Sequence, residues 1–336
     1  MATIGDVAEL AGVSIATVSR VVNARGRVLD ATRERVLRAV AELDYHPNRA
    51  AQHLRSGMTG IVLILTPNMT NPYYASILTG IGDTATARGY SAFTCITDED
   101  AARARDALEM LKHQRADGAI MLCSNGDPSL ASDFAASYPV IECSEHEPDT
   151  DVTHVSIDNY QAALDVMEHL ADLGHERIGH ISAANPYLST AERLRGYRDA
   201  LKARGIRYRA QYVEQGSADY SFASGKAAAG RLLALPEPPT ALFCISDTLA
   251  MGAEVAALER GLRVPADVSV TGFDDVQATM LHPYLTSLSQ PCHKLGSTSM
   301  EVLLELIGGE HPEKEIVLSH RLVVRESTAP NQKGTK

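Results

Sequence analysis

From residue 61 to about residue 275, short apolar segments alternate with longer stretches of helical periodicity, and this alternation limits the fold more than any other feature. A short apolar run between turn residues is typical of a strand buried on both faces, and strands that alternate with helices form parallel sheets. The expected strands are 61–65, 91–96, 119–123, 140–143, 155–157, 178–182, 210–213, 241–245 and 268–272, and the expected helices are 74–88, 101–115, 160–173, 190–204, 222–234 and 248–260. The pattern therefore predicts an α/β body of two doubly wound parallel-sheet units.

The N-terminal segment 1–57 follows a different, all-helical pattern. Thr3 is placed to cap a helix that begins at Ile4 and stops at Gly12, and Ser14 is placed to cap a second helix. A third helix is expected at about 30–43, and its apolar contacts are Val36, Leu37, Val40 and Leu43. Two short helices joined by a glycine turn predict a helix-turn-helix, whose second helix fits the major groove of DNA.

The charge is unevenly divided between these two parts. The 336 residues contain 31 Lys and Arg against 42 Asp and Glu, a net charge of −11. Residues 1–60 hold 8 Arg and 6 acidic residues, so the head carries +2 while the rest of the chain carries −13. A surplus of two charges in a segment of this length does not by itself differ from chance. Combined with the helix-turn-helix pattern, it favours a DNA-binding head on an acidic body.

The head string TIGDVAELAGVSIATVSRVVN, followed by TRERVLRAVAELDYHPNRAAQHLRSG, resembles the DNA-binding head and hinge of the LacI/GalR family of bacterial transcriptional regulators. The body continues the resemblance in NPYY, DGAIMLC, SIDNYQAA, LGHERIGHI, AERLRGY, PPTALFCISDTLAMGA, GLRVPADVSVTGFDD, PYLTSLSQP and LVVRESTAP. The resemblance implies a two-lobed, periplasmic-binding-protein-like effector domain. The implied bounds are a head at 1–57 with a hinge helix at about 48–54, an N-lobe at 58–157 plus about 290–319, a C-lobe at 158–289 plus about 320–328, and a disordered tail at 329–336.

The resemblance also implies roles for residues of the head. Ile15, Ala16 and Arg20 match base-reading positions, where an arginine can bind guanine bidentately and short apolar side chains contact thymine methyl groups. Leu54 matches the leucine that wedges into the central base step when two hinge helices fold on the operator. The residues that match phosphate or hinge contacts are Thr3, Ser14, Thr17, Ser19, Asn23, Asn48, Arg49, Ala51 and Arg55. Helix capping is an equally good use for the hydroxyls of this group.

In the body, the resemblance places a small-molecule effector in the cleft between the lobes, at the carboxyl ends of the strands. The matching positions are Tyr73, Tyr74, Glu145, Ser189, Arg193, Tyr220, Ser246 and Asp274. Arg193 and Asp274 suit vicinal hydroxyls as donor and acceptor, and the tyrosines offer flat faces to a ring. Asp158, Asp247 and Asp275 lie in equally strong strings, and we interpret them as caps or hinge contacts.

Sugars, sugar acids and nucleosides all remain possible effectors. The stretch 140–159 and the string LFCISD resemble the cytidine-repressor branch, which responds to a nucleoside, whereas sugars are the commonest effectors across the family. The predicted function is a ligand-responsive repressor that binds palindromic double-stranded operator DNA as a homodimer. The dimer contacts implied by the resemblance are the first helix of the N-lobe and the helix around 249–262.

Enzyme, transport and membrane functions fit the sequence less well. Gly80 to Ala85 matches GxGxxA but falls inside the expected helix instead of in the turn after a strand, so close helix packing explains it better than a dinucleotide. His175 and His180 lack a third ligand nearby, and the five cysteines form no CxxC pair, so we expect no metal, disulfide or cofactor. A solute-binding protein of the same fold would carry a signal peptide and no head. We therefore expect a cytoplasmic non-enzyme that contacts no membrane and joins the nucleoid when bound to DNA.

Overall fold

The computed structural model describes residues 2–22, 27–45, 58–123 and 126–332. The chain divides into two units, Met1–Thr59 and Gly60–Lys336, which are described separately. Within its described part, the head has three helices, α1 (Ile4–Ala11), α2 (Ile15–Val22) and α3 (Asp30–Glu42). Thr3 and Asp6 form a capping box at the start of α1, and Gly12 ends that helix with φ of 61°. The predicted helix-turn-helix is therefore present.

A small core holds the three head helices together. Its buried residues are Val7, Ala8, Ala11, Val18, Val21, Val36 and Ala39. Leu37, which was expected in this core, is 51% exposed, so that prediction is wrong. Val36 and Leu37 are neighbours on a helix and point about 100° apart, so only one of them faces the other two helices.

The first lobe of the body has a parallel sheet of six described strands in the order β11-β5-β4-β3-β1-β2. Its elements are β1 (Ile61–Thr66), β2 (Ser91–Ile96), β3 (Gly118–Met121), β4 (Val140–Cys143), β5 (Thr153–Ile157), β11 (Glu315–Leu318), α5 (Pro72–Ala87), α6 (Ala101–Lys112), α7 (Leu130–Ala135) and α12 (Cys292–Ile307). Val62 and Ile64 of β1 belong to the core under α5 and α12, whereas Leu63 and Leu65 belong to the core under α6 and α7. This lobe therefore has helices on both faces of its sheet.

The second lobe repeats the plan, with a sheet of six described strands in the order β12-β10-β9-β8-β6-β7. Its elements are β6 (Ile178–Ala183), β7 (Val213–Gly216), β8 (Ala241–Cys244), β9 (Ser269–Asp274), β10 (Thr286–Ser289), β12 (Arg321–Val323), α8 (Asn159–Asp172), α9 (Leu188–Ala203), α10 (Phe222–Leu233), α11 (Asp247–Glu259) and the 3₁₀ helix η1 (Ala210–Tyr212). The strand β12 is antiparallel to β10, while the other pairs in this sheet are parallel. The predicted fold class of two doubly wound sheets is confirmed.

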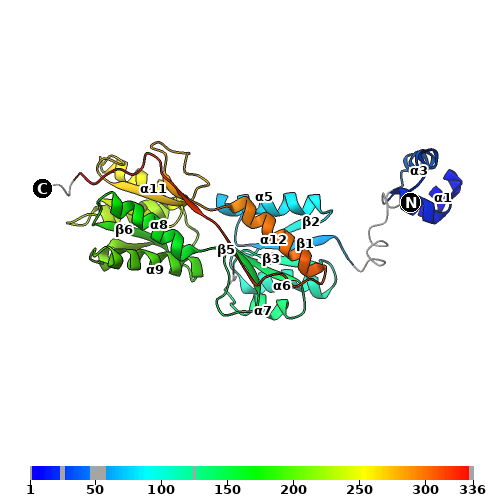
Figure 1. Ribbon diagram of the computed structural model, residues 1–336, viewed down its shortest axis with the longest axis horizontal. Coiled ribbons are helices and arrows are strands. Elements are labelled where there is room, and N and C mark those ends of the chain that lie inside the picture. Colours follow the sequence, from blue (N-terminus) through cyan, green and yellow to red (C-terminus); the bar gives the residue numbers. More distant parts are fainter. Residues whose placement is uncertain (1, 23–26, 46–57, 124–125, 333–336) are drawn as a thin grey trace. The chain divides into compact units, whose positions relative to one another are not determined.

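The described chain passes between the two lobes three times, from β5 to α8, from β10 to α12 and from β11 to β12. Figure 1 shows these crossings, with α12 lying along α5 although the two helices are far apart in sequence. The sequence pattern did not define α7, α12, β10, β11 or β12, and it placed the strand at 210–213, where η1 lies before β7.

The tail was expected to be disordered from residue 329, and this is wrong for its first residues. The backbone N–H of Ala329 donates to Ser269 Oγ at 3.1 Å, and that of Asn331 donates to the carbonyl oxygen of Leu173 at 2.8 Å. Ser327, just before them, is buried and donates to the carbonyl oxygen of Val270. These hydrogen bonds fasten the segment to the second lobe.

Candidate functional site

The predicted DNA-reading residues lie on the open face of α2. Val18 and Val21 are buried against the other head helices, which leaves Ile15, 53% exposed, together with exposed Ala16 and Arg20 on the outer side. A helix that presents a basic and two small apolar side chains in this way has the arrangement needed to read base edges.

Two of the predicted contact hydroxyls, those of Thr3 and Ser14, cap the helices of the head. Ser14 Oγ accepts a hydrogen bond from the backbone N–H of Thr17 at 3.2 Å and lies 2.9 Å from Thr17 Oγ1. Thr3 Oγ1 accepts from the backbone N–H of Asp6, and Ser19 is half-buried. The other predicted contact residues lie outside the described residues: Asn23, Asn48, Arg49, Ala51, Leu54 and Arg55.

The body contains a small cavity between its lobes, which we call the cleft cavity. It is lined by Asn71, Tyr73, Tyr74, Ser144, Glu145, Ser189, Arg193, Tyr220, Ile245 and Asp274. Seven of the eight predicted effector residues are in this lining, and they come from both lobes. Its free volume is about 20 Å³, which is room for about one water molecule and far below the roughly 300–1,000 Å³ of an occupied ligand pocket. The lobes are thus closed on each other.

Ser246 is the predicted effector residue that the cavity lining does not include. It is the N-cap of α11, and its Oγ accepts a hydrogen bond from the backbone N–H of Leu249 at 3.2 Å. The residue before it, Ile245, lines the cavity instead. A serine that follows a strand can also cap the next helix, and here the Ser246 hydroxyl forms such a cap.

Arg193 is the buried cation of the cleft cavity. Its Nε and Nη2 donate to Asn159 Oδ1 at 3.0 and 2.8 Å, its Nη1 donates to the carbonyl oxygen of Ile245 at 2.8 Å, and the guanidinium lies 3.7 Å from the centre of the Phe273 ring. A guanidinium has five N–H donors, so two remain beyond these three bonds. Arg193 is therefore held rigidly with donors left for a ligand.

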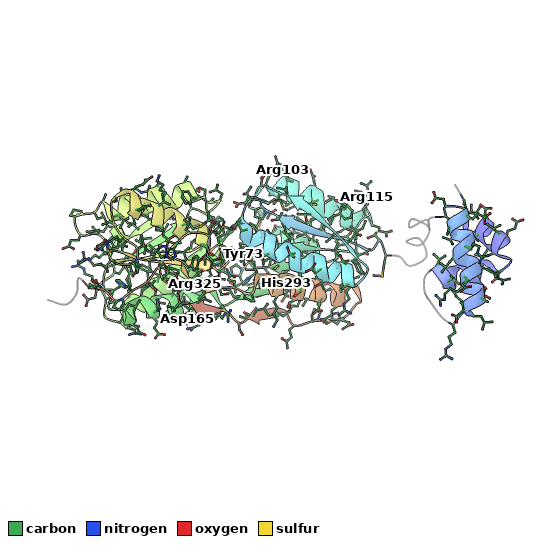
Figure 2. All side chains as sticks on the ribbon, turned by 90° about the horizontal axis from the view of Figure 1, so that it is seen from above. Tyr73, Arg103, Arg115, Asp165, His293 and Arg325 are labelled. Atoms are coloured by element: carbon green, nitrogen blue, oxygen red, sulfur yellow. The ribbon has the colours of Figure 1, made fainter. Side chains whose placement is uncertain are left out.

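Asp274 is joined to the opposite lobe through a chain of hydrogen bonds. Gln290 Nε2 donates to Asp274 Oδ1 at 2.7 Å, Tyr73 donates to Gln290 Oε1 at 3.2 Å, and Ser144 Oγ lies 2.7 Å from the Tyr73 hydroxyl. Burial raises the pKa of Asp274 to about 7, and the nearby charge of Arg193 partly opposes this rise. Figure 2 shows Tyr73 at the junction of the two lobes.

Three residues of the cavity lining have a backbone conformation that L-amino acids rarely adopt. The φ angles are 76° at Ser144, 58° at Tyr220 and 95° at Asp274. Such conformations cost about 1–3 kcal/mol each and concentrate at functional sites. Ser144 follows β4, Asp274 is the last residue of β9 and Tyr220 lies between a turn and α10, and all three line the cleft cavity.

Two further contacts join the lobes beside the cavity. Glu145, after β4, accepts hydrogen bonds from Ser189 of α9, and Tyr187 donates to Glu99 Oε1 at 2.7 Å. Burial raises the pKa of the Glu145 carboxyl, while its bonds to Ser189 and the charge of Arg193 act in the opposite direction.

Sequence patterns missed Asn71, Glu99, Ser144, Asn159, Tyr187 and Gln290. Asn71 and Ser144 each follow a strand, which was a usable signal, whereas the others are defined only by their partners.

Of the aspartates interpreted as caps or hinge contacts, Asp158 is a helix cap, whereas Asp247 and Asp275 bind other groups of the second lobe. Asp158 accepts from the backbone N–H of Gln161 at 2.8 Å at the start of α8. Asp247 accepts from two backbone N–H groups of the loop at 276–277 and from Ser287 Oγ, and Asp275 pairs with Arg325 at 2.7 Å.

The motifs rejected as enzyme signatures have structural uses. A Cβ added at Gly80 would lie 2.0 Å from the carbonyl oxygen of His293, so this glycine allows α5 and α12 to touch. The ring of His175 lies 2.9 Å from Thr240 Oγ1, and the ring of His180 stacks on Tyr197 and contacts Phe243 at a tilted angle. In the described part of the chain, no group of His, Cys, Asp and Glu side chains has the geometry to hold a metal ion. Among the same residues, no helix combines the length and apolarity needed to cross a membrane.

Comparison with known proteins decides the family. Residues 3–48 match the bacterial regulatory proteins of the lacI family, and residues 59–326 match the periplasmic binding proteins and sugar binding domain of the LacI family. The chain belongs to the LacI family. The resemblance noted in the sequence is thereby confirmed over nearly the whole chain.

This LacI-family chain is similar to regulators with different names. It is 36% identical to catabolite control protein A of Priestia megaterium over 97% of this chain and 99% of that protein. It is 34% identical to the repressors PurR of Photobacterium profundum and CytR of Escherichia coli, over 97% of this chain and 98% and 96% of those proteins. The crystal structure of the Lac repressor dimer bound to operator and the anti-inducer ONPF matches with a TM-score of 0.87 and 31% identity, over 98% of this chain and 99% of that one.

Proposed function

We propose that this LacI-family repressor binds operator DNA as a homodimer and that its effector is a small, hydroxyl-bearing ring compound held in the cleft cavity. The family supplies the DNA-binding head and the effector domain. The observation that carries the effector proposal is the convergence of Arg193, Asp274 and Glu145 with three tyrosines at the carboxyl ends of the strands of both lobes. Donors, acceptors and aromatic faces around one cavity suit a sugar, a sugar acid or a nucleoside.

Arg20 carries the proposed base recognition. Changing Arg20 to Ala should relax sequence preference and weaken specific binding by about 1–3 kcal/mol, because a bidentate arginine–guanine contact is lost. Fluorescence anisotropy on an operator chosen from a random DNA pool measures this, with Arg38→Ala, an exposed arginine of α3, as the matched control. Equal loss in the two variants would show that Arg20 provides only charge.

The effector class is tested by thermal melting against sugars, sugar acids, nucleosides and purines. A ligand at 100 times its dissociation constant stabilises the folded protein by about 2.7 kcal/mol. A shift with nucleosides alone would assign Tyr220 to stacking on the base, and a shift with one sugar would assign Arg193 and Asp274 to its hydroxyls. No shift with any class would overturn the effector proposal and leave the assignment of the head unaffected.

Dimer formation is supported by apolar side chains that the isolated chain leaves exposed. Phe93 and Ile96 on the edge strand β2 are 53% and 52% exposed, and Leu258 at the end of α11 is 72% exposed. Exposed apolar surface of this kind marks contact sites between proteins. Sedimentation velocity should find a dimer, and Ile96→Asp should shift it to the monomer; a wild-type monomer at micromolar concentration would refute this part of the proposal.

The remaining parts of the proposal concern what the protein does not do. We propose that it has no catalytic activity and no cofactor and works in the cytoplasm without membrane contact, because its relatives are named as transcriptional regulators. The alternative of a solute-binding protein of the same fold gives no use for a helix-turn-helix head. Retention of specific operator binding by the purified protein would exclude that alternative.

A further inference from the structure

The first residue of the body, Gly60, is tied to the sheet on two sides. Its carbonyl oxygen accepts a hydrogen bond from the backbone N–H of Ser91 at 2.8 Å, at the start of β2. Its own N–H donates to Asp117 Oδ2 at 2.7 Å, just before β3 begins. Because β1 lies between β2 and β3, the chain that comes from the head enters the body at a residue that is bound to both neighbouring strands.

The bond from Gly60 to Asp117 has a side chain as its acceptor. The backbone N–H of Asp117 also donates to the carbonyl oxygen of Ile61 at 2.8 Å, next to the first paired residues of β1 and β3. Asp117 therefore binds two consecutive residues, Gly60 through its carboxylate and Ile61 through its backbone. Hydrogen bonds to a charged acceptor are stronger than those between neutral groups. We call the bonded pair of Gly60 and Asp117 the entry clamp.

The backbone around Asp117 is closely packed. Ala116, which precedes it, is buried. A Cβ added at Gly118, which follows it, would lie 2.9 Å from the carbonyl oxygen of Pro139 and 2.9 Å from Cδ1 of Leu303 on α12. A well-packed interior resists such shifts, so the carboxylate is presented to Gly60 from a fixed position.

The backbone conformation of Gly60 sets the direction of the chain at this point. Its φ of 69° lies in the left-handed region, which glycine adopts far more readily than other residues. Among the described residues, a Cβ added at Gly60 would meet only the carbonyl oxygen of Gly89, at an ordinary contact distance of 3.9 Å. The backbone angle, and not a lack of space, is therefore what requires glycine here.

The entry clamp is separate from the effector site. It lies at the amino ends of β1 and β3, whereas the cleft cavity is lined by residues beyond the carboxyl ends of the strands. Figure 2 shows Arg115, two residues before Asp117, far along the first lobe from Tyr73. A role for the clamp is therefore to be sought in the connection to the head.

We propose that Asp117 is a positioning residue for operator binding: it fixes, with Gly60, where and in which direction each subunit's chain leaves for its head, so that the dimer selects one spacing of half-sites. Slack in such a connection lowers the effective concentration of the second head at its half-site and widens the range of spacings that two heads can span. Ordering one freed backbone residue again on DNA corresponds to about 5- to 30-fold in an equilibrium constant. The inference rests on the proposed dimeric binding of an operator.

Operator spacing tests the proposal with the full-length protein at one salt concentration. Fluorescence anisotropy compares an operator selected from a random DNA pool with versions that have one base pair inserted or removed at the centre. Asp117→Ala should bind the selected operator about tenfold more weakly than the wild type and lose less affinity when the spacing changes. Asp117→Asn, which keeps an acceptor oxygen, should restore both properties.

Two further variants separate positioning from a general loss of structure. Asp127→Ala removes a carboxylate of the same lobe that accepts from the backbone N–H of Ser129 at 3.0 Å, and it should leave affinity and spacing preference unchanged. Gly60→Ala strains the backbone of the clamp without a steric clash, and it should act in the same direction as Asp117→Ala. Sedimentation velocity and urea titration check that each variant remains a folded dimer.

Hydrogen exchange at the Gly60 amide reports the clamp without DNA. This amide should exchange about tenfold faster in Asp117→Ala than in the wild type, because its acceptor is lost. Fast exchange in the wild type would overturn the clamp, and unchanged affinity and spacing preference in Asp117→Ala would overturn its positioning role. A wild-type protein that bound all spacings alike would refute the proposed dimeric operator binding, and with it this inference.

Discussion

The glycines of the Gly80 to Ala85 segment give a stringent test of the packing argument. A Cβ at Gly80 would lie 2.0 Å from the carbonyl oxygen of His293 on α12, far inside the 3.4 Å at which ordinary contact begins. Backbone atoms cannot rotate away, so α5 and α12 would have to separate. Gly82, two positions further along the same helix, has no atom within 4 Å of its added Cβ. It is the matched control.

The two substitutions to alanine should change the free energy of unfolding in opposite directions. Overpacking lowers the free energy of unfolding by about 1–3 kcal/mol, whereas replacing a helical glycine by alanine raises it by about 0.5–1 kcal/mol. Gly80→Ala should therefore lower the free energy of unfolding by about 1–2 kcal/mol, and Gly82→Ala should raise it by about 0.5–1 kcal/mol. Urea titration followed by circular dichroism, at one protein concentration because of the proposed dimer, measures the difference.

The same pair separates the packing explanation from the dinucleotide explanation. If the glycines formed a phosphate-binding turn, either alanine would abolish binding of a dinucleotide and neither would change stability in this pattern. Equal effects of Gly80→Ala and Gly82→Ala on the urea midpoint would refute the contact between α5 and α12.

Three further predictions concern the core of the head, a buried carboxyl and a helix cap. Val36→Ala should destabilise the head by about 1–2 kcal/mol, since Val36 is fully buried. Leu37→Ala should change the stability of the head by less than about 0.5 kcal/mol. Thermal melting followed by the nuclear magnetic resonance signals of the head compares the two variants. Burial raises the pKa of Glu254 to about 8, so the native state keeps a proton that the unfolded chain releases above about pH 4.5, and stability falls as pH rises toward 8. In urea titrations between pH 5 and 8, Glu254→Gln should reduce the loss of unfolding free energy by a few kcal/mol. An unchanged dependence of stability on pH would contradict the burial argument. Ser246→Ala should lower the free energy of unfolding by about 1 kcal/mol, because the cap of α11 is lost. It should leave unchanged the affinity for any effector that thermal melting identifies. A large loss of affinity would instead place Ser246 in the effector site.

Local signals in the sequence were sufficient for the head and for most of the alternating body. Thr3 with Asp6 and the glycine at position 12 mark α1 at both ends, and the structure places a capping box and a left-handed residue there. Apolar runs with turn residues on both sides located the strands to within a few residues. These signals act over one or two turns of chain, so neighbouring residues determine them.

Elements whose stability depends on distant partners were not predictable in the same way. The helix α12 packs on α5, which lies near the opposite end of the body's sequence, and the strand β12 has three residues and depends on pairing with β10. Among the site residues, Arg193 and Asp274 follow from family position, but Asn159, Gln290 and Glu99 gain their roles only from hydrogen bonds to residues far away in the sequence. No pattern within one segment records those pairings.

Close glycine contacts explain why a change in the cleft would move whole lobes. In the first lobe, Gly80 and Gly296 each lie where a Cβ would overlap the backbone of the facing helix, and in the second lobe Gly225 and Gly252 do the same between α10 and α11. Helices locked backbone to backbone resist internal rearrangement, so each lobe should move as a rigid unit. Motion is then left to the three crossing segments and to the side chains that bridge the lobes. A change in the contacts between the lobes would therefore change the angle between two rigid bodies, and a small ligand could alter the whole effector domain.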